Sequence, residues 1–266
     1  MRVSVIQMAV KQDKEENLRR AGELVRRAAA EGCDLAVLPE MFCCPYSNRC
    51  FRPYAEEEGG RVWQFLSRLA RETGIWLVGG SMPELEEGRV YNTGYVFDRE
   101  GKQAARHRKV HLFDVNIRGG QVFRESETLS PGNEITVFDT EFGPVGLCIC
   151  FDFRFQELAK EMADRGARLL VVPAAFNMTT GPAHWELMFR QRAVDNQVFT
   201  LGAAPARDEG AEYVSYANSI LCDPWGSILA RAGSGEEILT GEVEFDRLDQ
   251  IRAQLPIRAA RRADLY

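Results

Sequence analysis

The sequences GCDLAVLPEMF, residues 32–42, and GARLLVVPAAF, residues 166–176, share one pattern. In each, a glycine follows a segment with helical spacing, a short continuous apolar run comes next, and a proline ends that run before a loop. Continuous apolar runs of this length are typical of strands that are covered on both faces. Many helix–strand units share parts of this pattern. Two such units in one chain nevertheless favour a pseudo-symmetric α/β sandwich whose strand ends converge on one site.

Alternating helices and strands are also expected on either side of these two segments, because apolar residues recur there at periods of about 3.6 or 2. The stretch 111–133 is loop-rich and too long to lack a function. No Pro/Gly/Ser-rich linker divides the chain, so residues 1–266 are predicted to form one domain. We expect strands at residues 2–8, 35–38, 75–82, 90–97, 103–108, 135–138, 145–150, 169–173 and 198–204, further strands within 215–245, and helices at 13–31, 61–72, 153–165, 183–197 and 246–254.

Composition and charge narrow the class of protein. The chain has 266 residues, 45% of them hydrophobic and 27% charged, which is ordinary for a globular protein. A net charge of -6 argues against nucleic acid or an anionic membrane as the main partner. No apolar run approaches the roughly 20 residues of a membrane helix, and the N-terminus lacks the pattern of a signal peptide. We therefore expect a cytoplasmic protein that binds neither nucleic acid nor membranes.

The seven cysteines predict free thiols. Their odd number, without a signal peptide, argues against a disulfide framework and for a reducing compartment. Cys43, Cys44 and Cys50 lie close together in sequence, but they lack C-x-x-C spacing and a nearby histidine. A metal site is therefore not expected there, and small buried thiols are the preferred interpretation.

Three polar residues at the ends of expected strands carry the chemistry. Cys150 ends the apolar run PVGLCIC, and a helix is expected directly after it, whose dipole would lower the pKa of the thiol. Cys148 points to the same side of that strand but lies deeper. Glu40 ends DLAVLPE, and Lys109 follows a third segment within RHRKVHLFD. A base, a cation and a thiol are the groups needed for nucleophilic attack on an amide carbon.

Some alternatives stay open at this level. The basic run holds several cations, and its sequence does not determine which of them points into a pocket. A Cys–His pairing of the thiol with His111 or His184 is possible, although no local signature supports it. The chain contains no G-x-S-x-G, Walker A, G-x-G-x-x-G or H-E-x-x-H motif, so other common catalytic sites are not indicated.

The segments LPEMF, RKVHLFD and GLCICFDFRFQE together resemble, in order, the three signature segments of the nitrilase, or carbon–nitrogen hydrolase, superfamily. The resemblance covers the whole chain. It implies a single-domain four-layer αββα sandwich that assembles into dimers or larger oligomers. It also implies Cys150 as nucleophile, Glu40 as general base and Lys109 as oxyanion stabiliser. The supporting glutamate of the family matches Glu125, with Glu127 close by.

Further segments, among them FRESETLSPG and the terminal RRADLY, look like the omega-amidase branch. That branch hydrolyses the terminal amide of 2-oxoglutaramate and 2-oxosuccinamate and needs no metal or organic cofactor. An amidase for deaminated glutathione or an N-carbamoyl compound is the nearest alternative, and a non-catalytic scaffold is a more distant one. The tail 256–266 is expected at a subunit interface. The residues expected to bind the substrate are Arg154, for its carboxylate, Tyr46, Phe176, Thr179 or Thr180, and Phe151.

Overall fold

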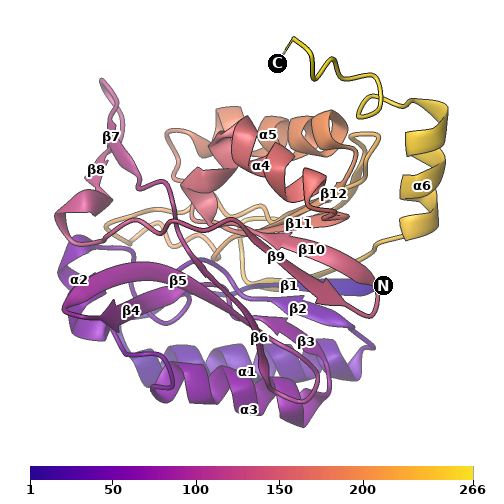
Figure 1. The fold of residues 1–266 in the computed structure, drawn as a ribbon. Coiled ribbons are helices and arrows are strands. Elements are labelled where there is room, and N and C mark those ends of the chain that lie inside the picture. The colour runs from indigo at the N-terminus through magenta and orange to yellow at the C-terminus, as the bar shows by residue number, and fades with distance from the viewer. Residues whose placement is uncertain (266) are drawn as a thin grey trace.

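The computed structural model describes residues 1–265, so Tyr266 of the expected interface tail lies outside the described residues. Two β-sheets form the centre of the molecule (Figure 1). The first sheet has the order β15 (Glu237–Glu242), β1 (Arg2–Gln7), β2 (Leu35–Val37), β3 (Trp76–Val78), β5 (Arg89–Phe97) and β4 (Met82–Glu86), with β6 (Gln103–Arg108) also paired to β5. The second has the order β14 (Ile228–Arg231), β13 (Ile220–Cys222), β12 (Phe199–Ala203), β11 (Leu169–Pro173), β10 (Gly143–Leu147) and β9 (Thr136–Thr140).

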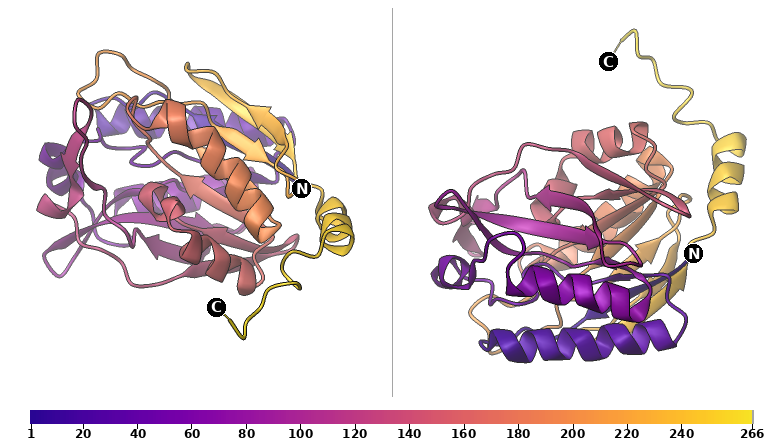
Figure 2. Two further views of the ribbon diagram at one scale, coloured as in Figure 1. Left: turned by 90° about the horizontal axis from the view of Figure 1, so that it is seen from above. Right: turned by 60° about the horizontal axis from the view of Figure 1, so that its bottom comes forward.

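Helices cover the outer face of each sheet, which gives the four layers (Figure 1). Helices α1 (Lys14–Ala30) and α3 (Arg61–Thr73) pack on the first sheet, and α4 (Gln156–Asp164) and α5 (Gly181–Asn196) pack on the second. The right-hand view of Figure 2 shows α1 and α3 side by side on one outer face. The predicted αββα sandwich is therefore confirmed.

The alternation of side chains along the central strands explains why both faces of each sheet are apolar. In β2, Leu35 and Val37 point into the core between the sheets, whereas Ala36 points toward the helices. In β11, Leu169 packs between the sheets and Leu170 packs toward the helices. Because successive residues of a strand point to opposite faces, a continuous apolar run serves two cores. This accounts for the two similar sequences at 32–42 and 166–176.

Several elements differ from those expected. The strand expected at 75–82 ends early: β3 stops at Val78, Gly80 turns the chain with a φ of +59°, and a separate strand, β4, begins at Met82. Helix α2 (Asn48–Tyr54) was not predicted, and it is short and contains Pro53. The loop-rich stretch contains the hairpin β7 (Asp114–Asn116) and β8 (Val122–Arg124), followed by a 3-10 turn, η1 (Glu125–Glu127).

The C-terminal segment follows α6 (Phe245–Gln254) and leaves the sandwich near the ends of α4 and α5. Arg258 donates to the carbonyl of Ala163 at 2.8 Å and to the carboxylate of Asp164 at 3.1 Å. Arg261 donates to the carbonyl of Asp195 at 3.1 Å. Within the described range, no helix is both long and apolar enough to cross a bilayer.

Gly80→Ala should lower the free energy of unfolding by more than about 2 kcal/mol and reduce turnover. An added Cβ would lie 2.1 Å from the carbonyl oxygen of Pro39, so the backbone that leads into Glu40 would have to move. Gly88→Ala is the matched control: its φ is +77° but no atom lies within 4 Å of an added Cβ, so only backbone strain of about 1 kcal/mol is expected. Equal losses in urea unfolding of the two variants would contradict the expected clash.

Candidate active site

A buried cluster of charged side chains lies where strands of both sheets end. The Nζ atom of Lys109 is 3.0 Å from Oε1 of Glu40 and 2.9 Å from Oε1 of Glu125. The side chains of all three residues are fully buried. Two carboxylates thus share one ammonium group in a site shielded from water, where electrostatic interactions are strong. The structure brings together the predicted base, the predicted cation and the predicted supporting glutamate.

The side chains of β6 and of the residue after it alternate between two faces, and this alternation determines which cation of the basic run enters the site. Successive side chains of a strand point to opposite faces, so His107 and Lys109 face inward while Arg106 and Arg108 face the other way. Arg108 donates to Glu84 at 2.7 Å and to Glu86 at 2.8 Å. The question that the sequence left open is thereby answered: Lys109 is the cation that enters the site.

The loop after β2 places Glu40 between the two sheets. Its Oε1 accepts a hydrogen bond from Nδ2 of Asn92 at 2.8 Å, and its Oε2 accepts one from the backbone N–H of Ala175 at 2.8 Å. Ala175 follows β11, so the loops of the two similar sequences meet at this carboxylate. Burial raises the pKa of Glu40, while Lys109 opposes the shift and Glu125 adds to it. A raised pKa suits a carboxylate that must accept and return protons.

The 3-10 turn η1 delivers Glu125, and the structure separates it from Glu127. The Oε2 atom of Glu125 accepts a hydrogen bond from the backbone N–H of Phe113 at 2.6 Å, and its Oε1 accepts one from the hydroxyl of Tyr46. Glu127 instead accepts a bond of 3.4 Å from Asn48 at the protein surface. Glu125 is therefore the glutamate that belongs to the buried cluster.

Cys150 lies in the same cluster but in a different local structure from the one predicted. The helix expected directly after it is a 3-10 helix, η2 (Cys150–Arg154), which begins at Cys150 itself, and the α-helix α4 begins only at Gln156. β10 has already ended at Leu147. Cys150 has a φ of +48°, a left-handed backbone conformation that residues other than glycine rarely adopt. The thiol is thus placed on a sharp turn between strand and helix.

The predicted decrease in the pKa of Cys150 is wrong. Burial raises the pKa of this thiol well above its usual value, the charge of Glu40 raises it further, and Lys109 only partly opposes the shift. A five-residue 3-10 turn has a small dipole, and full burial penalises the thiolate more than that dipole can favour it. A hydrogen bond between the thiol and Glu40 also disfavours the thiolate. Cys150 is therefore a thiol, and it lies beside the carboxylate of Glu40.

Asp152 connects the turn of Cys150 to the segment of Lys109, and sequence reasoning missed this role. Its buried carboxylate accepts from the ring of His107 at 2.9 Å, the ring of His111 at 2.8 Å and the backbone N–H of His111 at 2.8 Å. It also accepts the N–H of Ile149 at 3.1 Å. The only signal available in the sequence was an acidic residue two positions after the thiol.

The histidines offered as partners of the thiol have other partners in the structure. His111 binds Asp152 and stacks on Phe155, with 3.7 Å between ring centroids. His184 bonds to Arg154 at 3.0 Å. The Cys–His alternative thus has no support in the observed geometry, whereas Glu40 bonds to the thiol.

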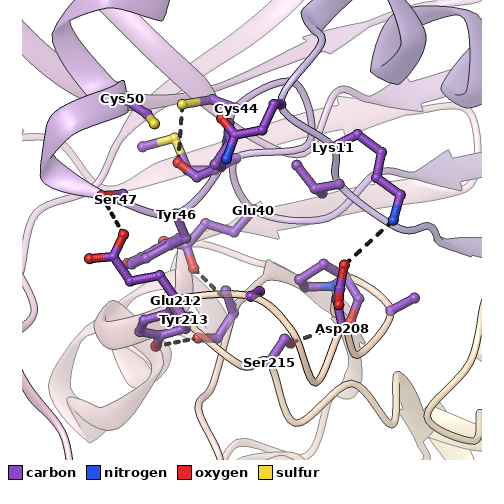
Figure 3. Close-up of a pocket in the computed structure, with 18 of the residues that line it drawn as sticks. Lys11, Glu40, Cys44, Tyr46, Ser47, Cys50, Asp208, Glu212, Tyr213 and Ser215 are labelled. Carbon is purple, nitrogen blue, oxygen red and sulfur yellow. Dashed lines mark hydrogen bonds and ion pairs between the residues drawn. The ribbon is translucent and has the colours of Figure 1, made fainter.

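A cavity of about 400 Å³ leads from the surface to the cluster (Figure 3). It meets the cluster at Glu40 and Tyr46. The loop 205–215 forms one of its walls, in which the ring of Tyr213 packs on that of Tyr46 with 4.5 Å between centroids. The hydroxyl of Tyr213 donates to the carbonyl of Ala175 at 2.7 Å. Asn92, Ala175 and Tyr213 are site residues that no sequence motif indicated.

The predicted substrate-binding residues fall into two groups. Tyr46 lines the cavity and donates to Glu125. Phe151, Phe176 and Arg154 are not among the residues that line it: Phe151 follows Cys150 directly and packs on Phe113, and the guanidinium of Arg154 is 4.5 Å from the ring centroid of Phe176. Thr179 does not line the cavity: it is exposed, and its hydroxyl accepts the N–H of Gln121 at 3.2 Å in the β7–β8 hairpin. The adjacent Thr180 is buried and donates to Asn177.

No cluster of three or more His, Cys, Asp or Glu side chains suited to hold a metal ion occurs in residues 1–265. Cys43 and Cys44 are buried and Cys50 is half-buried, all as free thiols.

The family follows from a direct comparison of the sequence. The family model described as carbon-nitrogen hydrolase matches residues 2–253. The chain belongs to the carbon–nitrogen hydrolase family. Members of this family cleave carbon–nitrogen bonds. The buried thiol, carboxylates and ammonium group of this chain therefore belong to a hydrolase.

Known proteins resemble this hydrolase over its whole length. Omega-amidase NIT2 of Mus musculus is 50% identical over 265 residues, which are 100% of this chain and 96% of that protein. The crystal structure of Saccharomyces cerevisiae Nit3, a member of branch 10 of the nitrilase superfamily, has a TM-score of 0.91 and 43% identity, with 98% and 96% of the two chains covered. A cysteine-to-alanine variant of an amidase from Nesterenkonia sp. AN1, in complex with butyramide, has a TM-score of 0.79 and 28% identity, with 98% and 97% covered.

The decrease of kcat/KM at low pH should report the protonation of Glu40. Because burial raises its pKa above the ordinary 4.5, kcat/KM should fall with decreasing pH through a midpoint above 4.5, as the base becomes protonated. The raised pKa of Cys150 predicts no gain in activity from a thiolate between about pH 7 and 9. Glu72→Gln, which removes an exposed carboxylate, should leave this profile unchanged. A midpoint at or below 4.5 would contradict the assignment.

Proposed function

We propose that this enzyme is an omega-amidase that hydrolyses the terminal amide of 2-oxoglutaramate and 2-oxosuccinamate to the 2-oxo dicarboxylate and ammonia. The observation that carries the proposal is the buried cluster of Cys150, Glu40 and Lys109 together with Arg154, which has no acidic partner among residues 1–265. Full-length relatives at 47–50% identity that bear the name omega-amidase support the choice of substrate.

Acylation begins with the transfer of the thiol proton of Cys150 to Glu40. The sulfur attacks the amide carbon, and the negative charge that develops on the amide oxygen is stabilised by Lys109 and the backbone N–H of Phe151. The C–N bond then breaks, Glu40 gives its proton to the leaving nitrogen, and ammonia departs. The product of this half-reaction is a thioester on Cys150 with Glu40 again ionised.

Deacylation uses the same groups with water as the nucleophile. Glu40 accepts a proton from the water, the hydroxyl oxygen attacks the thioester carbon, and Lys109 again faces the oxyanion. Cleavage of the C–S bond releases the carboxylic acid, and Glu40 returns the proton to the sulfur. Glu125 holds Lys109 in place and orients the substrate amide. No step requires a metal or an organic cofactor.

Arg154 is proposed to bind the 2-oxo carboxylate at the far end of the substrate. It lies four residues after Cys150, and among residues 1–265 it forms no ion pair with an aspartate or glutamate. A half-buried guanidinium without an acidic partner is well suited to a planar carboxylate, which it can bind in a bidentate manner. Phe176 supplies an aromatic face beside it.

We further propose that residues 1–266 form one domain, that two or more copies assemble, and that the protein acts in the cytoplasm. Free thiols throughout the described chain support a reducing compartment. Large apolar side chains support assembly: Leu187 of α5 is 62% exposed and Trp225 is 58% exposed, and α5 contacts the turn of Trp225 through a 2.8 Å bond from Arg190 to the carbonyl of Gly226.

Ammonia release should distinguish the proposed substrate from its rivals. We expect rapid release from 2-oxoglutaramate and little from glutamine, deaminated glutathione or a simple nitrile. Cys150→Ala should abolish release, because the nucleophile is lost, while circular dichroism and the unfolding midpoint stay close to those of the parent. Turnover of another amide but not of 2-oxoglutaramate would retain the mechanism and exclude the proposed substrate. Activity retained in Cys150→Ala would contradict the mechanism itself.

Leu187→Glu should reduce the molecular mass in solution to that of one 30.0 kDa chain, because a charge would be placed in the apolar contact. Light scattering after size-exclusion chromatography measures this mass. Removal of residues 256–266 tests whether the tail also belongs to the interface. A parent protein that is already monomeric would contradict the proposed assembly.

A further inference from the structure

The guanidinium of Arg154 is held in a defined position without the use of a carboxylate. Its Nη1 is 3.0 Å from Nδ1 of His184 and 3.8 Å from Sδ of Met188, and its Cζ is 4.5 Å from the ring centroid of Phe176. Arginine ordinarily reaches such order through an acidic partner. A carboxylate of the protein at this place would neutralise the cation and compete with an anionic substrate.

The hydrogen bond from Arg154 determines which ring nitrogen of His184 carries the proton. A guanidinium is only a donor, so Nδ1 of His184 must accept and the ring proton must be on Nε2. Burial and the charge of Arg154 both lower the pKa of His184, which agrees with a neutral ring. His184 therefore orients Arg154 and leaves its positive charge available.

Phe176 and His184, two of the groups that contact the guanidinium, belong to one short segment. Phe176 follows β11, and His184 lies in the first turn of α5, where its N–H donates to the carbonyl of Thr180 at 2.9 Å. Between them, the side chain of Asn177 accepts the N–H groups of residues 179 and 180, each at 3.0 Å. Trp185 packs against Phe176, with 5.0 Å between centroids, and donates to the carbonyl of Asn218 at 2.7 Å. The segment 176–185 is thus pinned at both ends.

We propose that His184 is a positioning residue for substrate selection, which holds Arg154 ready for the 2-oxo carboxylate through one neutral hydrogen bond. The inference rests on the proposed function, because it assumes that Arg154 binds that carboxylate. Because Nδ1 of His184 is occupied by the hydrogen bond from Arg154, we assign His184 no part in proton transfer. Its loss should therefore weaken the binding of substrate and leave the chemical step unchanged.

The test measures KM and kcat for 2-oxoglutaramate. His184→Ala should raise KM about tenfold, as expected for the loss of a hydrogen bond to a charged group, with kcat within about twofold of the parent. His184→Asn should restore most of the lost affinity, because an amide oxygen can replace Nδ1 as acceptor. Gln191→Ala, an exposed change on the same helix, is the matched control and should alter neither constant.

A double-mutant cycle separates this inference from the proposed function. Arg154→Gln alone should raise KM strongly, and no increase would overturn the proposed carboxylate site and the role of His184 with it. In the Arg154→Gln background, His184→Ala should have no further effect, because its partner is absent. Independent, multiplicative effects of the two changes, or a loss of kcat at constant KM in His184→Ala, would overturn the positioning role while leaving the carboxylate site intact.

Discussion

The ammonium group of Lys109, buried between the carboxylates of Glu40 and Glu125, is the interaction on which the rest of the site depends. Removal of one partner from a buried ion pair costs about 3–5 kcal/mol, because an uncompensated charge stays in the interior. The three residues come from different loops, so this one contact fixes where those loops lie. Burial is the main cause of the raised pKa of the Cys150 thiol, and the charges of this cluster modify that shift.

Burial and the excess of negative charge in the cluster explain how one site can hold both a protonated thiol, Cys150, and a carboxylate base, Glu40. Burial, and after it the negative charge of Glu40, raises the pKa of the Cys150 thiol, and Lys109 only partly opposes this shift, so the proton stays on the sulfur. Glu40 can accept that proton because burial has raised its pKa. In the proposed mechanism, the side chains of Glu40, Lys109 and Glu125 thus both keep the thiol protonated at rest and activate it. No change of fold is needed.

The two ends of the proposed substrate encounter different kinds of electrostatic environment. At the amide end, Lys109 is fully paired with carboxylates and acts as a fixed donor. At the other end, Arg154 is held by a neutral imidazole and aromatic rings, and no carboxylate among residues 1–265 compensates its charge. Asp152 belongs to the amide end, where it ties the turn of Cys150 to the residues that precede and follow Lys109.

The sequence by itself determined an α/β sandwich and placed Glu40 and Cys150 at the ends of apolar runs, because such runs and the residues that end them are local features. The four-layer form and the choice of Lys109 among the cations of the basic run came from the resemblance to the carbon–nitrogen hydrolase superfamily. The sequence did not determine the +48° φ of Cys150 or the raised pKa of its thiol, since both depend on burial by distant segments. Only the tertiary structure distinguished Glu125 from Glu127, placed Thr179 outside the cavity and revealed Asp152 as a link between two loops. Long-range contacts decide such features, and spacing along the chain does not encode them.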